Sequence, residues 1–372
     1  MSRQVKHQSG LDDLDRYVPG TPVEEVQRQY GLQNVIKLAS NENPLGPSPR
    51  AVGAIREALS RLNTYPDGES KDLRQALAGF LGVDPSHLTV GNGGDGIIME
   101  TCLAYLDQGD EVVVSRTSFP VYDVYTRVMR ARLVKTPLKE YRLDLEAMAA
   151  AITARTKLVI VCNPNNPTGT IVTADEVAAF MERVPDHVLV MFDEAYHELV
   201  DADDYPDTLA YVRAGRRNVL VLRTFSKVFG LAGVRLGYGV GVPEVIEPLQ
   251  RVKEPFAVNL LAQAAGIGAL EDEAFLRRTV DVIRKERRYL YAHFEDLRLH
   301  YVPSHTNFVL VRIGPNAPEI QERLKRKGVI VRPCREYDIP HFLRITVGER
   351  PQNERLVSAL EGALSETAQV PS

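Results

Sequence analysis

The middle of the chain alternates short apolar runs with helical patterns, and several of these runs are apolar at both odd and even positions. "KLVIVCNP" (157–164) and "HVLVMFDEAY" (187–196) are examples. This pattern is typical of a strand that is covered on both faces, as in a mostly parallel sheet flanked by helices. One of the intervening helical patterns, Ala174–Val184, carries a capping-box signature in Thr173 and Glu176. The chain is therefore expected to be α/β, with strands at Glu111–Ser115, Thr156–Cys162, His187–Asp193, Asn218–Thr224 and Val234–Val240.

The C-terminal third has a different organisation. One amphipathic pattern without Gly or Pro runs from Asp272 to Leu297 and predicts a long connecting helix. The segment beyond it is expected to form a small α+β unit, with strands at Thr306–Ile313, Val329–Pro333 and Phe342–Val347 and helices at Ala317–Lys327 and Gln352–Leu364.

The two ends of the chain, residues 1–40 and the tail after Ser365, show little periodicity. We expect residues 1–40 to associate with the small domain. The predicted division is then a large domain at 41–271, a connecting helix at 272–297 and a small domain at 298–372.

The charge balance and the cysteines exclude several classes of protein. The chain has 45 basic and 49 acidic residues and a net charge of −4, which argues against a nucleic-acid or membrane-binding surface. No apolar stretch reaches about 18 residues, and the N-terminus lacks the apolar segment of a signal peptide. Cys102, Cys162 and Cys334 show no C-x-x-C spacing, and the eight histidines show no metal-binding spacing. We therefore expect a cytoplasmic protein without a metal site.

The stretch "GNGGDG" (91–96) spells G-x-G-x-x-G between two apolar runs, as in a strand that turns into a helix. Backbone N–H groups at a helix N-terminus favour a bound phosphate. A dinucleotide site would place an acidic residue about 20 positions on, at the end of the next strand. Arg116 follows that strand instead, so an NADP-dependent oxidoreductase remains an alternative to a smaller phosphate ligand and to a simple tight turn.

Three further motifs follow expected parallel strands. They are "NPNNPTG" (163–169), "FDEAY" (192–196) and "TFSKVFGLAGVRLGY" (224–238). Ligands of α/β folds bind at the carboxyl ends of such strands. We therefore expect the three motifs to meet at one site.

The side chains of these motifs have complementary chemistry. Lys227 lies in an apolar, glycine-rich loop, where a desolvated lysine becomes a good nucleophile. Asp193 would need a cation such as a protonated pyridine nitrogen, and Tyr196 and Asn166 suit a phenolic oxygen. A phosphate-binding set is formed by Thr224, Ser226, Arg235 and the amides of Gly94, Asp95 and Gly96. An aldehyde, a pyridine nitrogen and one phosphate together describe pyridoxal 5′-phosphate.

The chain resembles the fold-type I pyridoxal-phosphate-dependent transferases, in particular the histidinol-phosphate aminotransferases, from about Tyr17 to Leu364. The resemblance also rests on "NENPLGPSP" (41–49), "YP" (65–66) and "FLRITVG" (342–348). Family members usually read G-N-G-[SA]-D-E where this chain has glycines at 94 and 96. The resemblance implies a large domain with a mostly parallel central sheet flanked by helices, plus a smaller α+β domain.

The resemblance also implies roles for individual residues. Lys227 would form the Schiff base with pyridoxal phosphate and move the α-proton, Asp193 would pair with the pyridine nitrogen, and Tyr196 and Asn166 would contact the phenolic oxygen. Phe119 would stack on the ring. The phosphate would be bound by Gly94, Asp95, Thr224, Ser226 and Arg235, with Tyr65 contributed by a second subunit of a homodimer. The substrate would be bound by Arg344, Arg332 and Asn43.

The implied reaction converts L-histidinol phosphate and 2-oxoglutarate to imidazole acetol phosphate and L-glutamate, in histidine biosynthesis. A broad-specificity aromatic amino acid aminotransferase and a decarboxylase of the same fold are alternatives, because they share the motifs. A regulator with an aminotransferase-like domain would need a DNA-binding unit, for which the roughly 40 residues before "NENP" leave no room.

Overall fold

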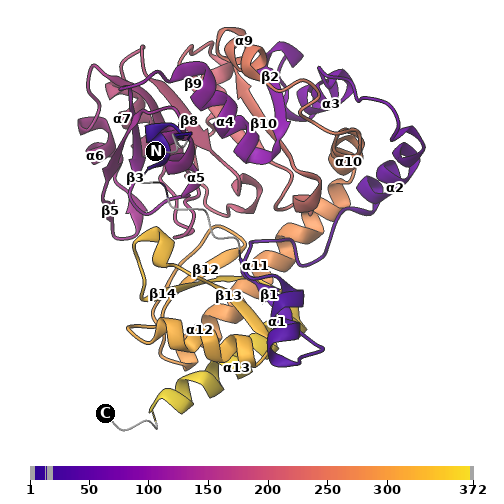
Figure 1. The fold of residues 1–372 in the computed structure, drawn as a ribbon, viewed down its shortest axis with the longest axis vertical. Helices are drawn as coiled ribbons and strands as arrows, with labels where there is room; N and C mark the ends of the chain where they lie inside the picture. Colours follow the sequence, from indigo (N-terminus) through magenta and orange to yellow (C-terminus); the bar gives the residue numbers. More distant parts are fainter. Residues whose placement is uncertain (1–4, 13, 15–19, 369–372) are drawn as a thin grey trace.

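The computed structural model of the protein describes residues 5–12, 14 and 20–368. These residues form a seven-stranded sheet and a five-stranded sheet, with one long helix running between the two (Figure 1). Parts of the segment expected to associate with the small domain, residues 1–4, 13 and 15–19, lie outside the described residues, as do residues 369–372.

The seven-stranded sheet is parallel except for β10 (Leu236–Gly241), which is antiparallel to both of its neighbours. Every residue of β8 (Leu189–Asp193) and β9 (Val219–Thr224) is buried, which agrees with the apolar character of these runs at both odd and even positions. The α/β prediction is therefore confirmed, with strand boundaries within two residues of those expected. The strand order is β2 (Leu88–Asn92), β10 (Leu236–Gly241), β9 (Val219–Thr224), β8 (Leu189–Asp193), β7 (Thr156–Cys162), β3 (Glu111–Ser115) and β4 (Arg132–Thr136).

This sheet and the helices around it pack against each other through one apolar core. In α7 (Ala174–Arg183) the predicted capping box is present: the Thr173 hydroxyl accepts from the Glu176 amide at 3.3 Å, and the Thr173 amide donates to Glu176 Oε2 at 2.7 Å. The helices that contribute to this core are α2 (Pro49–Ala58), α3 (Lys71–Leu81), α4 (Gly93–Tyr105), α5 (Val121–Val128), α6 (Leu145–Ala150), α7 (Ala174–Arg183), α8 (Leu209–Arg213), α9 (Pro243–Val252) and α10 (Leu260–Leu270).

The five-stranded sheet has a second core and includes a strand from the beginning of the chain. Its order is β1 (Ile36–Leu38), β13 (Val329–Pro333), β14 (Phe342–Thr346), β12 (Phe308–Arg312) and β11 (Tyr301–Val302). The helices α1 (Val23–Tyr30), α12 (Ala317–Arg326) and α13 (Arg350–Ala368) lie beside it (Figure 1).

The N-terminal segment is more regular than its sequence suggested. Strand β1 pairs in parallel with β13, with Ile36 opposite Val329. Helix α1 has eight residues and buries only Val26 among them. Since β1 has three residues and a partner almost 300 positions away, its pairing leaves no local trace in the sequence.

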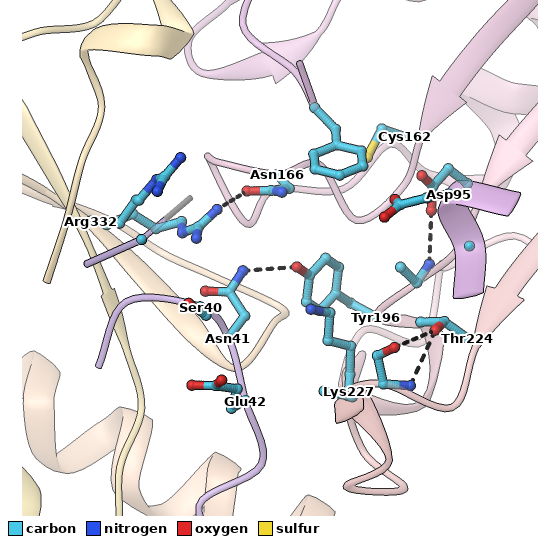
Figure 2. A pocket seen from close by; sticks show the side chains of 18 of the residues that line it. Ser40, Asn41, Glu42, Asp95, Cys162, Asn166, Tyr196, Thr224, Lys227 and Arg332 are labelled. Atoms are coloured by element: carbon cyan, nitrogen blue, oxygen red, sulfur yellow. Dashed lines mark hydrogen bonds between the residues drawn. The ribbon is translucent and has the colours of Figure 1, made fainter. Parts of the chain in front are cut away.

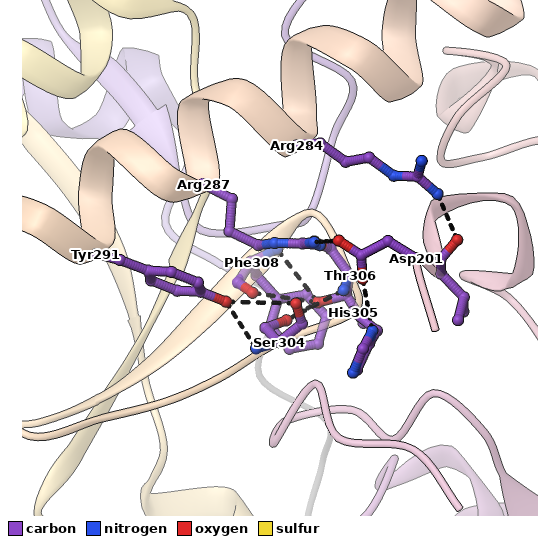
Figure 3. Close-up of polar contacts among 9 residues, drawn as sticks. Asp201, Arg284, Arg287, Tyr291, Ser304, His305, Thr306 and Phe308 are labelled. Carbon is purple, nitrogen blue, oxygen red and sulfur yellow. Dashed lines mark hydrogen bonds and ion pairs between the residues drawn. The ribbon is translucent and has the colours of Figure 1, made fainter. Parts of the chain in front are cut away.

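Helix α11 (Glu273–Asp296) connects the two parts, close to the expected range. Asp272 caps it by accepting from the Phe275 amide at 3.3 Å. The buried Arg287 donates to the Thr306 carbonyl at 2.9 Å and to Asp201 Oδ2 at 2.7 Å, so it ties the loop after β8 to the segment before β12 (Figure 3). His305 Nδ1 lies 2.7 Å from the other Asp201 oxygen.

Short elements complete the chain. They are the hairpin strands β5 (Leu138–Lys139) and β6 (Arg142–Leu143), and the 3₁₀ turns Ser9–Leu11, Leu59–Arg61, Pro85–His87, His197–Leu199, Ala232–Val234 and Arg335–Tyr337.

Candidate active site

The motifs that follow β7, β8 and β9 meet at one cavity. Cys162 and Asp193 end neighbouring strands in register, and Thr224 ends the next strand. The cavity has a volume of about 260 Å³ and opens between the two sheets (Figure 2). The predicted site residues that line it are Gly94, Asp95, Phe119, Asn166, Asp193, Tyr196, Thr224, Ser226, Lys227, Arg235, Arg332 and Arg344.

Lys227 projects into this cavity from the loop after β9. Its Nζ lies 5.6 Å from the centre of the Tyr196 ring. Burial, and then the positive charge of Arg344, lower the pKa of Lys227 to about 8. The neutral amine, which can act as a nucleophile or a base, is therefore much more populated near neutral pH than in an ordinary lysine.

The Lys227 loop is held in place by the segment that contains "NENPLG". Gly230 has φ +70°, and a Cβ there would lie 2.0 Å from the Gly46 carbonyl oxygen, so only glycine allows this close approach. The Asn43 amide donates to the Val228 carbonyl at 2.8 Å. Asn43 is therefore occupied in the loop contact and does not line the cavity. Asn41, two residues earlier, lines it instead.

Asp193 is buried on the wall formed by the strand ends, with 4% of its surface exposed. Tyr122 donates to its Oδ2 at 2.6 Å, and the Ala195 amide donates to its Oδ1 at 3.1 Å. Burial raises the pKa of Asp193 to about 6, although both hydrogen bonds oppose the rise. A buried carboxylate of this kind is stabilised by any cation that enters the cavity.

The part of the cavity at the start of α4 is suited to an anion. Helix α4 begins at Gly93, and the preceding Asn92 makes no side-chain capping hydrogen bond. The first amides of the helix are thus available to a negatively charged group. The Thr224 hydroxyl lies 3.0 Å from that of Ser226, and Arg235 Nη2 lies 3.2 Å from Asp95 Oδ2.

Glycines make this anion-binding end possible. Gly93 has φ +75°, and a Cβ there would lie 2.5 Å from Arg235 Nη2. A Cβ on Gly237 would lie 2.5 Å from the Gly93 carbonyl carbon, so β10 and the start of α4 approach each other closely. Gly96, where the related motif usually has Glu, is buried in the first turn of α4, and the turn is helical without that side chain.

Tyr196 and Asn166 have polar partners within the cavity (Figure 2). The Asn41 amide donates to the Tyr196 hydroxyl at 2.8 Å. Arg344 Nη1 donates to Asn166 Oδ1 at 2.5 Å. Burial raises the pKa of Tyr196, so its hydroxyl stays protonated and can donate a hydrogen bond.

Two arginines enter the cavity from the five-stranded sheet. Arg332 on β13 and Arg344 on β14 are directly opposite each other in the antiparallel ladder. Arg344 Nη1 also donates to the Tyr337 hydroxyl at 2.9 Å, and Arg344 Nη2 donates to the Ala39 carbonyl at 2.8 Å. Arg332 pairs with Glu336 on the short turn after β13.

Tyr65 does not reach the cavity of its own chain. It is 81% exposed and stacks on Phe256 with the ring centres 4.6 Å apart. Three polar groups at this site were not predicted from the sequence: Asn41 and Tyr337, which line the cavity, and Tyr122, which hydrogen-bonds to Asp193. The partners of Asn41 and Tyr122 are distant in sequence, whereas Tyr337 lies seven residues before its partner Arg344.

Among residues 5–12, 14 and 20–368, no cluster of three or more His, Cys, Asp or Glu side chains is suited to a metal ion. In the same residues, no helix combines the length and apolar character needed to cross a membrane.

The comparisons with known proteins define the class first. Residues 33–360 match the family model of the class I and II aminotransferases. The chain is 53% identical to the histidinol-phosphate aminotransferase of Moorella thermoacetica, over 97% of this chain and 93% of the relative. It is 47% identical to that of Symbiobacterium thermophilum, over 94% and 96% of the two chains. The chain therefore belongs to the class I and II aminotransferases and, within them, to the histidinol-phosphate aminotransferase family.

Solved structures agree with this assignment. The histidinol-phosphate aminotransferase of Sinorhizobium meliloti, solved with pyridoxal 5′-phosphate, superimposes with a TM-score of 0.88 at 30% identity, over 98% of this chain and 99% of the other. A single mutant of Thermus thermophilus aspartate aminotransferase gives a TM-score of 0.82 at 25% identity, over 99% of this chain and 100% of the other.

Proposed function

We propose that the protein is a pyridoxal 5′-phosphate-dependent aminotransferase that converts L-histidinol phosphate and 2-oxoglutarate to imidazole acetol phosphate and L-glutamate. The observation that carries this proposal is the pair Arg332 and Arg344, side by side on β13 and β14 at the cavity of Lys227. One arginine can hold a carboxylate by a two-pronged contact, and a phosphate, which is larger and more highly charged, recruits a second cation. The identity of the chain to the histidinol-phosphate aminotransferases of Moorella and Symbiobacterium supports the assignment of this reaction of histidine biosynthesis.

The cavity has the groups that pyridoxal phosphate requires. When bound, this cofactor withdraws electrons from the substrate α-carbon and so makes the α-proton acidic. We assign its phosphate to the start of α4, Thr224, Ser226 and Arg235, and its pyridine nitrogen to Asp193. The uncapped amides of α4 and the buried Asp193 carboxylate support these assignments. Phe119, which lines the cavity, is assigned to the face of the ring.

Lys227 is the group we assign to proton transfer. Because the pKa of Lys227 is lowered to about 8, its amine can accept the α-proton and return it at the next step. Tyr196 and Asn166 are assigned to the phenolic oxygen of the cofactor, and the hydrogen bond from Asn41 orients Tyr196. Arg344 is assigned to the anionic group of both substrates, the α-carboxylate of glutamate and the phosphate of histidinol phosphate, and Arg332 is assigned mainly to the phosphate.

A homodimer with a shared active site is part of the proposal. Tyr65 is assigned to the cofactor phosphate of the partner subunit. Its exposure supports this assignment, as does its place beside other exposed apolar side chains. These are Leu59, Leu62 and Phe256, which are 47%, 59% and 43% exposed.

We also propose a cytoplasmic location. Cys102, Cys162 and Cys334 are all free and buried, which suits a reducing compartment.

Half-reaction absorbance tests the function. Purified holoenzyme is mixed with histidinol phosphate, phenylalanine, tyrosine or glutamate, and the change in the cofactor spectrum gives a rate for each amino donor. Histidinol phosphate and glutamate should react fastest. If phenylalanine and tyrosine react as efficiently as histidinol phosphate, the protein is a broad-specificity aromatic aminotransferase instead. Borohydride treatment followed by peptide mass spectrometry should locate the cofactor on Lys227.

A further inference from the structure

Arg332 is held by a carboxylate that does not belong to the cavity around Lys227. Glu336 lies on the 3₁₀ turn after β13, four residues along the chain, and its side chain is 27% exposed, whereas that of Arg332 is only 7% exposed. Of these two residues, only Arg332 lines the cavity of Lys227, and both line a second cavity that adjoins it.

The contact occupies one complete edge of the guanidinium group. Arg332 Nε donates to Glu336 Oε1 at 2.8 Å, and Arg332 Nη2 donates to the same oxygen. An arginine binds a phosphate most strongly when two neighbouring N–H groups of the arginine donate to two oxygens of the phosphate. A phosphate that uses this edge must therefore displace the Glu336 carboxylate.

We propose that Glu336 is a specificity-determining residue that competes with the substrate phosphate for Arg332. The idea rests on the proposed function, in which one site alternates between a phosphorylated amine and glutamate. When glutamate occupies the site, no phosphate is present, and a buried arginine without an anion would be costly. Glu336 neutralises Arg332 in that half-reaction. When the phosphate arrives, the carboxylate turns toward solvent, which its partial exposure and its position on a short turn allow.

Binding of inorganic phosphate to the holoenzyme tests this role without any turnover. The holoenzyme is used because its own cofactor phosphate already occupies the end of the cavity at α4. Isothermal titration calorimetry gives the dissociation constant of phosphate for wild type, Glu336→Gln and Glu336→Ala. Both substitutions remove the competing charge, so phosphate should bind about tenfold more tightly, equivalent to about 1.4 kcal/mol. Unchanged or weaker binding in the folded variants would overturn the proposal, because it would make Glu336 a support for Arg332 rather than a competitor.

A double-mutant cycle shows whether Glu336 acts through Arg332. In an Arg332→Gln background the further change Glu336→Gln should leave phosphate affinity within about twofold, since the shared partner is gone. An equal gain in both backgrounds would indicate a general electrostatic effect and would refute the proposed competition. Glu319→Gln is the matched control, because Glu319 also pairs with an arginine four residues away, Arg323, outside the site. It should leave the dissociation constant of phosphate unchanged.

Failure of this proposal and failure of the proposed function give different results. A protein that gains phosphate affinity in Glu336→Gln but does not transaminate histidinol phosphate would disprove the function and retain the competition. A protein that transaminates histidinol phosphate but gains no phosphate affinity in Glu336→Gln would retain the function and disprove the competition.

Discussion

The Tyr122 hydroxyl donates a 2.6 Å hydrogen bond to Asp193 Oδ2, and both side chains are buried. Tyr122 comes from α5 and Asp193 from the end of β8, 71 residues apart. A hydrogen bond to the ionised form of a carboxyl group lowers its pKa. Tyr122 thereby works against the burial that raises the pKa of Asp193.

Tyr122→Phe should raise the pKa of Asp193 further above its present value of about 6. The loss of a hydrogen bond to a charged group, about 1.5–3 kcal/mol, corresponds to roughly one to two pKa units. The titration is measured by NMR on apoprotein with ¹³C-labelled Asp carboxyl groups, with the resonance assigned from Asp193→Asn. Tyr125→Phe, one turn along the same helix, is the control. A titration midpoint that does not move in Tyr122→Phe would show that the hydrogen bond does not tune Asp193.

Lys227 should react as an amine with an ordinary acylating reagent at unusually low pH. Only the neutral amine reacts, and the pKa of Lys227 is lowered from 10.5 to about 8, so its labelling in the apoprotein should rise with pH and reach half its maximum near 8. Mass spectrometry of the peptide gives the labelling rate at each pH. Because the charge of Arg344 contributes to the shift, Arg344→Gln should move the midpoint upward. A midpoint above about 10, the ordinary range of lysine, would contradict the assignment of Lys227 as the base.

Arg332→Ala and Arg344→Ala should have different substrate profiles. Charge-assisted contacts contribute about 1.5–3 kcal/mol. Arg332→Ala should therefore lower kcat/KM for histidinol phosphate by about one to two orders of magnitude, and for phenylalanine much less. Arg344→Ala should reduce kcat/KM for every substrate. Steady-state kinetics with histidinol phosphate and phenylalanine provides the measurement. Equal losses of kcat/KM for the two donors in Arg332→Ala would remove the argument that Arg332 binds a phosphate.

Glu194, next to Asp193, forms a buried ion pair that should support the stability of the fold. Its carboxylate lies 2.8 Å from Arg223 Nη2, and their side chains are 0% and 6% exposed. Glu194→Gln leaves Arg223 buried without its counter-charge, so the free energy of unfolding of the apoprotein should fall by about 3–5 kcal/mol. Urea denaturation provides the measurement.

The control for this ion pair is Glu273→Gln, which breaks the exposed pair with Arg277 on α11. It should change the free energy of unfolding by less than about 1 kcal/mol. Similar losses in the two variants would show that burial does not strengthen the Glu194 contact. The double variant Glu194→Leu/Arg223→Met should recover part of the loss, because neither charge of this pair is then left buried without the other.

The local chemistry of the strands and the motifs after them was readable from the sequence. The continuous apolar runs predicted β7, β8 and β9, and the carboxyl-end rule predicted that Asn166, Asp193 and Lys227 would lie close together. The cavity contains all three. The division of the chain at residues 41, 272 and 298, and the individual roles of the site residues, stay predictions.

Other features were beyond the sequence because they depend on the positions of residues distant in the chain. The pairing of β1 with β13 is one, and the selection of Asn41 rather than Asn43 as the cavity asparagine is another. The two asparagines of this motif are equivalent in the sequence, and only the hydrogen bond from Asn43 to the loop that contains Lys227 distinguishes them.

The sequence by itself determined the α/β fold and the motifs whose residues, among them Asn166, Asp193 and Lys227, line one cavity. These depend on periodicity, on turn chemistry and on residue type, all of which are local properties. Only the tertiary structure decided the electrostatic state of the site. The pKa values of Lys227 and Asp193 depend on burial and on Arg344 and Tyr122, and the availability of Arg332 depends on Glu336. Charges interact through space over a few ångströms, and the fold alone fixes those distances.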